Sequence, residues 1–261
     1  MHRIGVFDSG IGGLTVLRQL RRAFPQLDMV YLGDTARVPY GGRSVETITH
    51  YAEDDVRFLL RKDVEAIVIA CGTVSSNSLD ALREKFAMPI YGVIESAARL
   101  AASMTKTRSV GVIGTQATVK SGAYETHIRA IDPGVHVVSR ACPLFVPLVE
   151  NGIAPDDIVA ETVCSRYMEA FDGENIDALI MGCTHYPVYR PALEKRLPGV
   201  RMIDVGEALA EALRPLFAEG RGTGAVEYYV TERSAAFDEI VRVMDPSLDP
   251  AAIRVENAFI Q

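Results

Sequence analysis

Two cysteines occupy matching places in two similar segments of this chain. Cys71 follows the apolar run 66–70, and Cys183 follows the run 178–182. Short apolar runs that are rich in β-branched residues are typical of strands buried on both faces of a parallel sheet. Ligands of open α/β sheets bind at the carboxyl ends of such strands. The sequence therefore predicts that both thiols lie where a ligand binds.

A pair of thiols can invert a carbon atom that carries a hydrogen next to a carboxylate. One thiol removes the proton from one face, and the other returns a proton to the opposite face. With each transfer spanning about 3–3.5 Å, the sulfur atoms would stand roughly 6–7 Å apart across the substrate, too far for a disulfide. The candidates for holding or moving these protons are Asp8, Glu150 and His185.

Other interpretations of these residues have weaker support. Each cysteine alone is as well explained by core packing, because free cysteines are often buried. An internal repeat favours a catalytic role for both cysteines instead. Residues 3–9 resemble residues 109–115, as expected if an α/β unit with one thiol per copy is duplicated. A zinc site that includes His185 has no short ligand spacing to support it. The glycine-rich loop 10–15 has Thr15 where a dinucleotide fingerprint needs its last glycine.

Composition sets the broad class of the protein. The 261 residues are 48% hydrophobic, enough for a sizeable core. A net charge of −7 provides no basic field for nucleic acid. No apolar run approaches the roughly 18 residues that a membrane span needs, and Asp8 interrupts any signal-peptide core, so we expect a cytoplasmic protein. Cys142 and Cys164 are expected to be structural, and all four thiols reduced.

Alternating strands and helices predict an α/β fold of two pseudo-symmetric domains. Each domain is expected to be a mostly parallel sheet flanked by helices, with the active site in the cleft between them. The first domain would take 1–95 plus 206–261, and the second 96–205. Helices are expected over 75–86 and 118–131, an apolar loop with two prolines over 142–152, and a tail from 226 that docks on one domain.

Five short motifs carry a resemblance to a known family: 8–13 (DSGIGG), 39–44 (PYGGRS), 71–73 (CGT), 141–150 (ACPLFVPLVE) and 183–187 (CTHYP). With them the chain resembles, nearly end to end, the glutamate racemases of the cofactor-independent aspartate/glutamate racemase family. The resemblance implies interconversion of L- and D-glutamate for peptidoglycan synthesis, with no cofactor or metal, by a homodimer.

The resemblance also implies roles for individual residues. Cys71 would act on the D-enantiomer with help from Asp8, and Cys183 on the L-enantiomer with help from His185 and Glu150. The positions expected to bind substrate are Asp8, Ser9, Tyr40, Gly41, Gly72, Thr73, Thr115, Thr118, Thr184 and His185. We expect backbone N–H groups and hydroxyls, not Arg37 or Arg43, to hold the substrate carboxylates.

Gly72 departs from the family pattern, in which most members carry an asparagine that contacts substrate. We expect either a lost hydrogen bond, worth about 0.5–1.5 kcal/mol, or freed space that admits another substrate. Three alternatives to a glutamate racemase stay open: a racemase of another acidic amino acid, a decarboxylase that uses one thiol, and a non-catalytic binding protein on the same scaffold.

Overall fold

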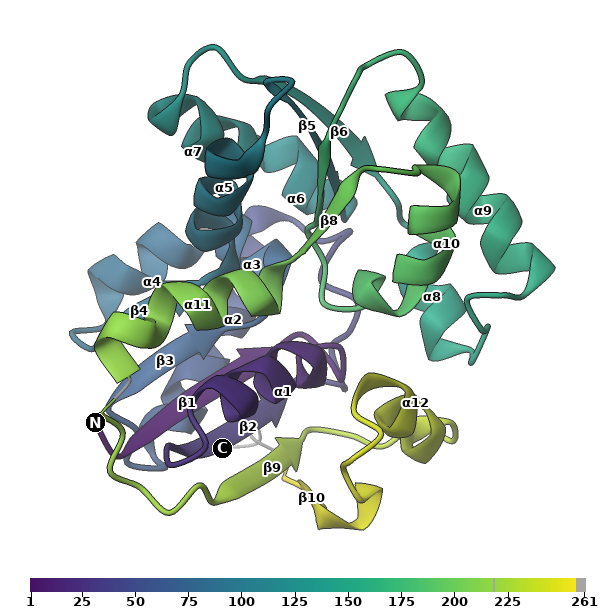
Figure 1. Cartoon of the computed structure of the whole chain (residues 1–261). Coiled ribbons are helices and arrows are strands. Elements are labelled where there is room, and N and C mark those ends of the chain that lie inside the picture. Colours follow the sequence, from purple (N-terminus) through teal and green to yellow (C-terminus); the bar gives the residue numbers. More distant parts are fainter. Residues whose placement is uncertain (218, 257–261) are drawn as a thin grey trace.

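Two parallel sheets form the framework of the molecule (Figure 1). The computed structural model describes residues 1–217 and 219–256. The first sheet has the strand order β10-β9-β2-β1-β3-β4, and the second has the order β6-β5-β7-β8. The strands are β1 Arg3–Asp8, β2 Asp28–Gly33, β3 Ala66–Ile69, β4 Ile90–Gly92, β5 Ser109–Gly114, β6 His136–Ala141, β7 Ala178–Met181, β8 Arg201–Asp204, β9 Val226–Val230 and β10 Ile253–Val255.

The order of the strands repeats between the two sheets. The run β2-β1-β3-β4 of the first sheet matches β6-β5-β7-β8 of the second, and all of these pairs are parallel. The central strands β1, β3, β5 and β7 are almost entirely buried, as their continuous apolar runs predict. The predicted α/β class with two helix-flanked parallel sheets is confirmed.

Helices cover the sheets, and polar side chains fix where several of them begin. Ser44 accepts a hydrogen bond from the Thr47 N–H at the start of α2, and Thr115 accepts one from the Thr118 N–H at the start of α6. The helices are α1 Leu14–Ala23, α2 Val45–Leu60, α3 Gly72–Asn77, α4 Leu79–Lys85, α5 Val93–Met104, α6 Gln116–Ser121, α7 Ala123–Ile131, α8 Phe145–Glu150, α9 Ile158–Met168, α10 Arg190–Arg196, α11 Val205–Phe217 and α12 Phe237–Met244. In the described part of the chain, no helix is long and apolar enough to cross a membrane.

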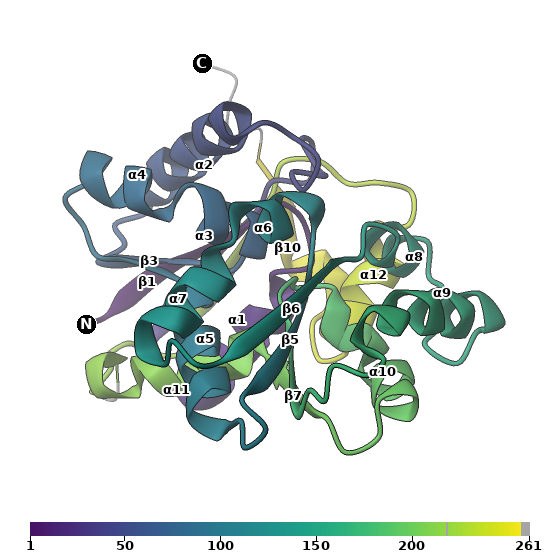
Figure 2. The ribbon, with the colours of Figure 1, turned by 90° about the horizontal axis from the view of Figure 1, so that it is seen from above.

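The chain crosses between the sheets twice. Helix α5 leads from β4 to β5, and α11 leads from β8 back towards β9. These two helices pack against each other (Figures 1 and 2). After the return, β9 pairs with β2 from Met29↔Val226 to Gly33↔Val230. The tail therefore docks on the first sheet and extends it by two strands.

Three expected elements differ in the structure. The expected helix 75–86 is divided at Ser78 into α3 and α4, and the expected helix 118–131 is divided at Gly122, which has a left-handed φ of 65°. The segment 142–152 is not an irregular loop, because it contains α8. Pro147 is the third residue of this helix, where a backbone N–H would have no partner within the helix, so its ring is tolerated.

Candidate active site

Both thiols line one cavity of about 360 Å³, to which the two sheets contribute residues that follow their strands. Cys71 and Gly72 come after β3, and the segment 183–186 comes after β7. The lining residues are Ser9, Val38, Pro39, Tyr40, Gly41, Gly42, Cys71, Gly72, Thr73, Thr115, Gln116, Pro143, Val146, Pro147, Glu150, Cys183, Thr184, His185 and Tyr186. The duplicated strands thus bring one cysteine each to a shared space.

Cys71 is buried and lies at the N-cap position of α3. Its Sγ donates a hydrogen bond to Ser9 Oγ at 3.5 Å. Burial, together with the nearby charge of Asp8, raises the pKa of the Cys71 thiol to about 12. Cys71 therefore rests as a neutral thiol at pH 7 and is ready to donate a proton.

Asp8 ends β1 and is fully buried, and it does not line the cavity, so the structure does not support its expected contact with substrate. Its carboxylate accepts hydrogen bonds from the Gly10 N–H at 3.1 Å and from Thr184 Oγ1 at 3.5 Å. Burial raises the pKa of Asp8, although the charge of His185 and these hydrogen bonds oppose the change. Asp8 therefore links the half that carries Cys71 to the half that carries Cys183.

The Cys183 thiol stands at one end of a line of three polar groups. His185 Nδ1 lies 3.9 Å from Cys183 Sγ, and His185 Nε2 lies 3.1 Å from Glu150 Oε1. Burial lowers the pKa of His185, but contact with Cys183 and Glu150 outweighs it and raises the pKa to about 10. His185 is therefore an imidazolium at neutral pH, and it lies between the Cys183 sulfur and the Glu150 carboxylate.

Threonine hydroxyls from both sheets meet at the side of the cavity. Thr73 Oγ1 and Thr115 Oγ1 are 2.9 Å apart, and Thr115 Oγ1 donates to Thr118 Oγ1 at 3.0 Å. Thr118 is buried behind Thr115 and does not line the cavity, so the structure does not support its expected contact with substrate. Its observed partners indicate that it orients Thr115.

The loop that carries Tyr40 is held by a buried cluster of charges. The Tyr40 hydroxyl donates to Asp34 and, at 3.3 Å, to Asp55, so it points away from the substrate space. Arg37 forms ion pairs with Asp34, with Asp55 at 3.4 Å and with Asp54 at 2.9 Å. Arg37 does not line the cavity, and neither does Arg43.

The cavity also contains residues that the sequence analysis did not select. Pro143, Val146, Pro147 and Tyr186 lie inside the motifs quoted above, but their place in the site depends on α8 and on the turn after Cys183. Gln116 belongs to no motif. Its position directly after Thr115, at the end of a buried strand, is the signal that could have found it.

Gly72 lines the cavity, but backbone lies close to the place of its missing side chain. A Cβ atom at this position would lie 2.2 Å from the carbonyl oxygen of Gly182, in the strand-end segment that carries Cys183. A side chain here would have to displace that backbone, so this geometry does not support the expectation that the glycine makes room for another substrate.

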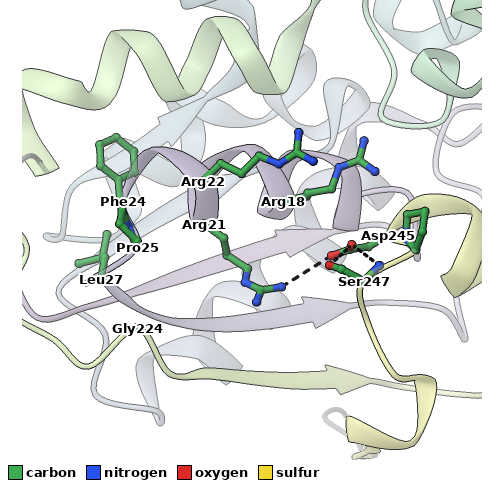
Figure 3. A pocket seen from close by; sticks show the side chains of 10 residues that line it. Arg18, Arg21, Arg22, Phe24, Pro25, Leu27, Gly224, Asp245 and Ser247 are labelled. Atoms are coloured by element: carbon green, nitrogen blue, oxygen red, sulfur yellow. Dashed lines mark hydrogen bonds and ion pairs between the residues drawn. The ribbon is translucent and has the colours of Figure 1, made fainter.

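A second hollow, of about 420 Å³, lies between α1 and the tail (Figure 3). Arg21 on α1 forms an ion pair at 3.7 Å with the buried carboxylate of Asp245, and Arg18 and Arg22 also line it. This hollow holds no thiol or imidazole. Across the described residues, no three His, Cys, Asp or Glu side chains are placed to hold a metal ion. The cavity with the two cysteines is the candidate active site.

The fold and this cavity define a class: a duplicated α/β protein in which each half contributes one thiol to a shared cleft. The sequence matches the Asp/Glu/Hydantoin racemase family over residues 4–213, and the chain belongs to that family. A glutamate racemase of Aquifex aeolicus (strain VF5) is 46% identical over 242 residues, 93% of each chain.

Solved structures of glutamate racemases share the fold. That of Thermus thermophilus, in complex with beta-chloro-D-alanine, is 44% identical with a TM-score of 0.85, over 98% of this chain and 96% of its own. That of Francisella tularensis subsp. tularensis SCHU S4, in complex with D-glutamate, is 34% identical with a TM-score of 0.89, over 99% of this chain and 98% of its own.

Proposed function

We propose that this chain interconverts L- and D-glutamate by moving the α-proton between two thiols. The observation that carries the proposal is that Cys71 and Cys183 line one cavity from its two halves, each with its own polar neighbours. The relatives of 34 to 46% identity described above, all glutamate racemases, support glutamate as the substrate. The product D-glutamate would serve peptidoglycan synthesis.

The two halves of the cavity suit opposite parts of the reaction. With L-glutamate, a thiolate on Cys183 takes the α-proton while the His185 imidazolium balances its charge. The neutral thiol of Cys71 then gives its proton to the other face, and D-glutamate results. Cys183 is left as the thiol and Cys71 as the thiolate, so D-glutamate is converted by the reverse transfers.

Binding of the two substrate carboxylates is assigned to hydroxyls and backbone N–H groups. Ser9, Thr73, Thr115 and Thr184 line the cavity, and its described lining includes no arginine or lysine. Hydrogen-bond donors that are fixed in place can stabilise the charge that develops on the α-carboxylate as the proton leaves. The net charge of the whole chain is therefore no obstacle to an acidic substrate.

We also propose the organisation of the chain in solution. The strands of the first sheet fall within 1–95 and 206–261, and those of the second within 96–205, which supports these ranges as two domains. The family resemblance supports a cytoplasmic homodimer. Sedimentation equilibrium of the purified chain measures the oligomeric state directly.

Proton exchange in D₂O tests the two-thiol mechanism. Cys71→Ala should lose racemisation by several orders of magnitude yet still exchange the α-proton of L-glutamate through Cys183. Cys183→Ala should do the reverse and exchange only D-glutamate. Cys164→Ser, a buried thiol that does not line the cavity, is the matched control and should racemise normally. Near-normal racemisation by either active-site variant would refute the mechanism.

A further inference from the structure

We propose that the hollow between α1 and the tail is a second binding site, which takes a phosphomonoester that also carries hydroxyl groups, the chemistry of a sugar phosphate. Arg18, Arg21 and Arg22 line the hollow from α1, and the segment 245–247 lines it from the tail (Figure 3). Its volume of about 420 Å³ suits a small molecule. The hollow shares no lining residue with the cavity of the two cysteines, so the inference is independent of the proposed racemisation.

The charges that line the hollow do not cancel. Three guanidinium groups face a single carboxylate, that of Asp245, which leaves an excess of two positive charges. Arg21 pairs with Asp245 at 3.7 Å, but Arg18 and Arg22 form no ion pair with any described residue. A phosphomonoester carries about −1.5 to −2 charges at pH 7, so it balances this excess better than a ligand with one carboxylate.

Arg18 and Arg22 are placed to hold the phosphate group. They are four residues apart in α1, so they lie one turn apart on the same face of the helix. In Figure 3 their side chains extend from the helix in the same direction, while Arg21 turns towards Asp245. A planar guanidinium group can donate two parallel hydrogen bonds to the oxygens of a phosphate. The phosphate of the ligand therefore binds beside α1.

Two buried polar atoms of this hollow have no hydrogen-bond partner. Among the described residues, four buried side-chain nitrogen or oxygen atoms have none, and two of these, Arg18 Nε and Asp245 Oδ2, belong to residues that line the hollow. An unpaired buried polar group costs stability, so two of them in one hollow indicate a ligand that pairs with both. Arg18 Nε needs an acceptor, which a phosphate supplies. Asp245 Oδ2 needs a donor, which a hydroxyl group of the same ligand supplies.

The tail fixes the carboxylate of Asp245 in place. Its other oxygen, Oδ1, accepts hydrogen bonds from the Ser247 hydroxyl at 2.6 Å and from the Ser247 N–H at 3.1 Å. The Asp245 N–H donates to the carbonyl of Val241 at 2.8 Å, at the end of α12. Because the side chain is fully buried and held by Oδ1, Oδ2 keeps a constant position opposite α1. It therefore selects for the hydroxylated part of the ligand and not for the phosphate.

Calorimetry in a phosphate-free buffer tests the site with three probes. Glucose 6-phosphate should bind saturably, inorganic phosphate should bind more weakly because it cannot reach from α1 to Asp245, and glucose should not bind. Arg18→Gln and Arg22→Gln should each weaken the binding of glucose 6-phosphate roughly 10- to 100-fold, because each removes a hydrogen bond between charged groups. Asp245→Asn keeps an oxygen for Ser247 but replaces Oδ2 with an amide, so it should weaken glucose 6-phosphate and not inorganic phosphate.

The control is Arg166→Gln, which changes an arginine that is 80% exposed on α9 and does not line the hollow, and it should bind all three probes as the wild type does. All variants should keep the wild-type kcat/KM for glutamate, because none of these residues lines the cavity of the two cysteines. If Asp245→Asn does not fold, the two arginine variants decide, since their side chains lie at least partly in solvent.

Three results would overturn the inference. Glucose 6-phosphate could fail to bind, inorganic phosphate could bind equally well, or Arg18→Gln and Arg22→Gln could both bind glucose 6-phosphate with the wild-type affinity. The second result would indicate an adventitious ion only. A wild type that binds glucose 6-phosphate and does not racemise glutamate would contradict the proposed function and leave this site intact.

Discussion

Replacement of the carboxylate of Glu150 should weaken the half of the site that contains Cys183. Glu150 Oε1 lies 3.1 Å from His185 Nε2, and the contact helps to raise the pKa of His185 to about 10. A hydrogen bond between charged groups contributes about 1.5–3 kcal/mol. If that amount is lost from the transition state, Glu150→Gln lowers kcat/KM roughly 10- to 100-fold at pH 8.

The assay must allow for the symmetry of the reaction. Enantiomers have equal free energies, so kcat/KM falls by the same factor in both directions and cannot reveal which thiol is affected. The exchange of the α-proton in D₂O does reveal which thiol is affected. We expect this exchange to slow for L-glutamate, which reacts at Cys183. The alkaline limb of the pH profile should also move to lower pH, because the pKa of His185 falls when the carboxylate is removed.

An exposed pair of the same kind provides the control. His136 Nε2 and Glu174 Oε2 are also 3.1 Å apart, but their side chains are 60% and 40% exposed. Glu174→Gln should leave turnover and the pH profile unchanged, because solvent screens such pairs. The reasoning is refuted if Glu150→Gln keeps the wild-type rate and alkaline limb, or if Glu174→Gln changes them equally.

The pair of buried His185 and partly buried Glu150 also predicts how stability depends on pH. The pKa of His185 rises on folding from 6.5 to about 10, so its contribution is complete below pH 6.5 and is lost as the pH rises through about 10. The free energy of unfolding, measured with urea, should therefore fall over that range in the wild type. The fall should be smaller in Glu150→Gln.

Two further predictions concern the rest of the molecule. Arg37→Ala leaves the buried carboxylates of Asp34 and Asp55 without their ion pair, and it should lower the free energy of unfolding by about 3–5 kcal/mol at pH 7. The loss of stability should be smaller at acidic pH, because burial raises the pKa of both carboxyls and they become protonated, and so neutral, as the pH falls. An equal loss at all pH values would contradict this account. Dialysis against EDTA should leave kcat/KM for glutamate unchanged, and activity that disappears and returns with zinc would argue for a metal site.

The strands around the site could be predicted from sequence because their signals are local. The runs that end at Cys71 and Cys183 are continuous and apolar, and each forms the predicted buried strand, β3 or β7. Because Cys71 and Cys183 come directly after these runs, their positions at the strand ends could be predicted as well. The apolar runs of buried parallel strands are long enough to be recognised in the sequence without knowledge of the neighbouring strands.

Other features depend on segments far away in the sequence and could not be predicted locally. The prolines of 142–152 indicate a loop, yet Pro147 falls in the first turn of α8, where it is tolerated. The surroundings of Gly72 include the carbonyl of Gly182, more than one hundred residues later. A sequence shows that a side chain is absent, but only the fold shows what occupies its place.

The late position of β9 and β10 has a consequence for synthesis on the ribosome. Strand β2 receives its neighbour β9 only after all of the second sheet has been translated, because β9 begins at Val226 and β8 ends at Asp204. Until then one edge of β2 has unpaired backbone groups that can pair with other chains. A nascent chain that stalls after α11 would therefore contain both thiols and still be prone to aggregation.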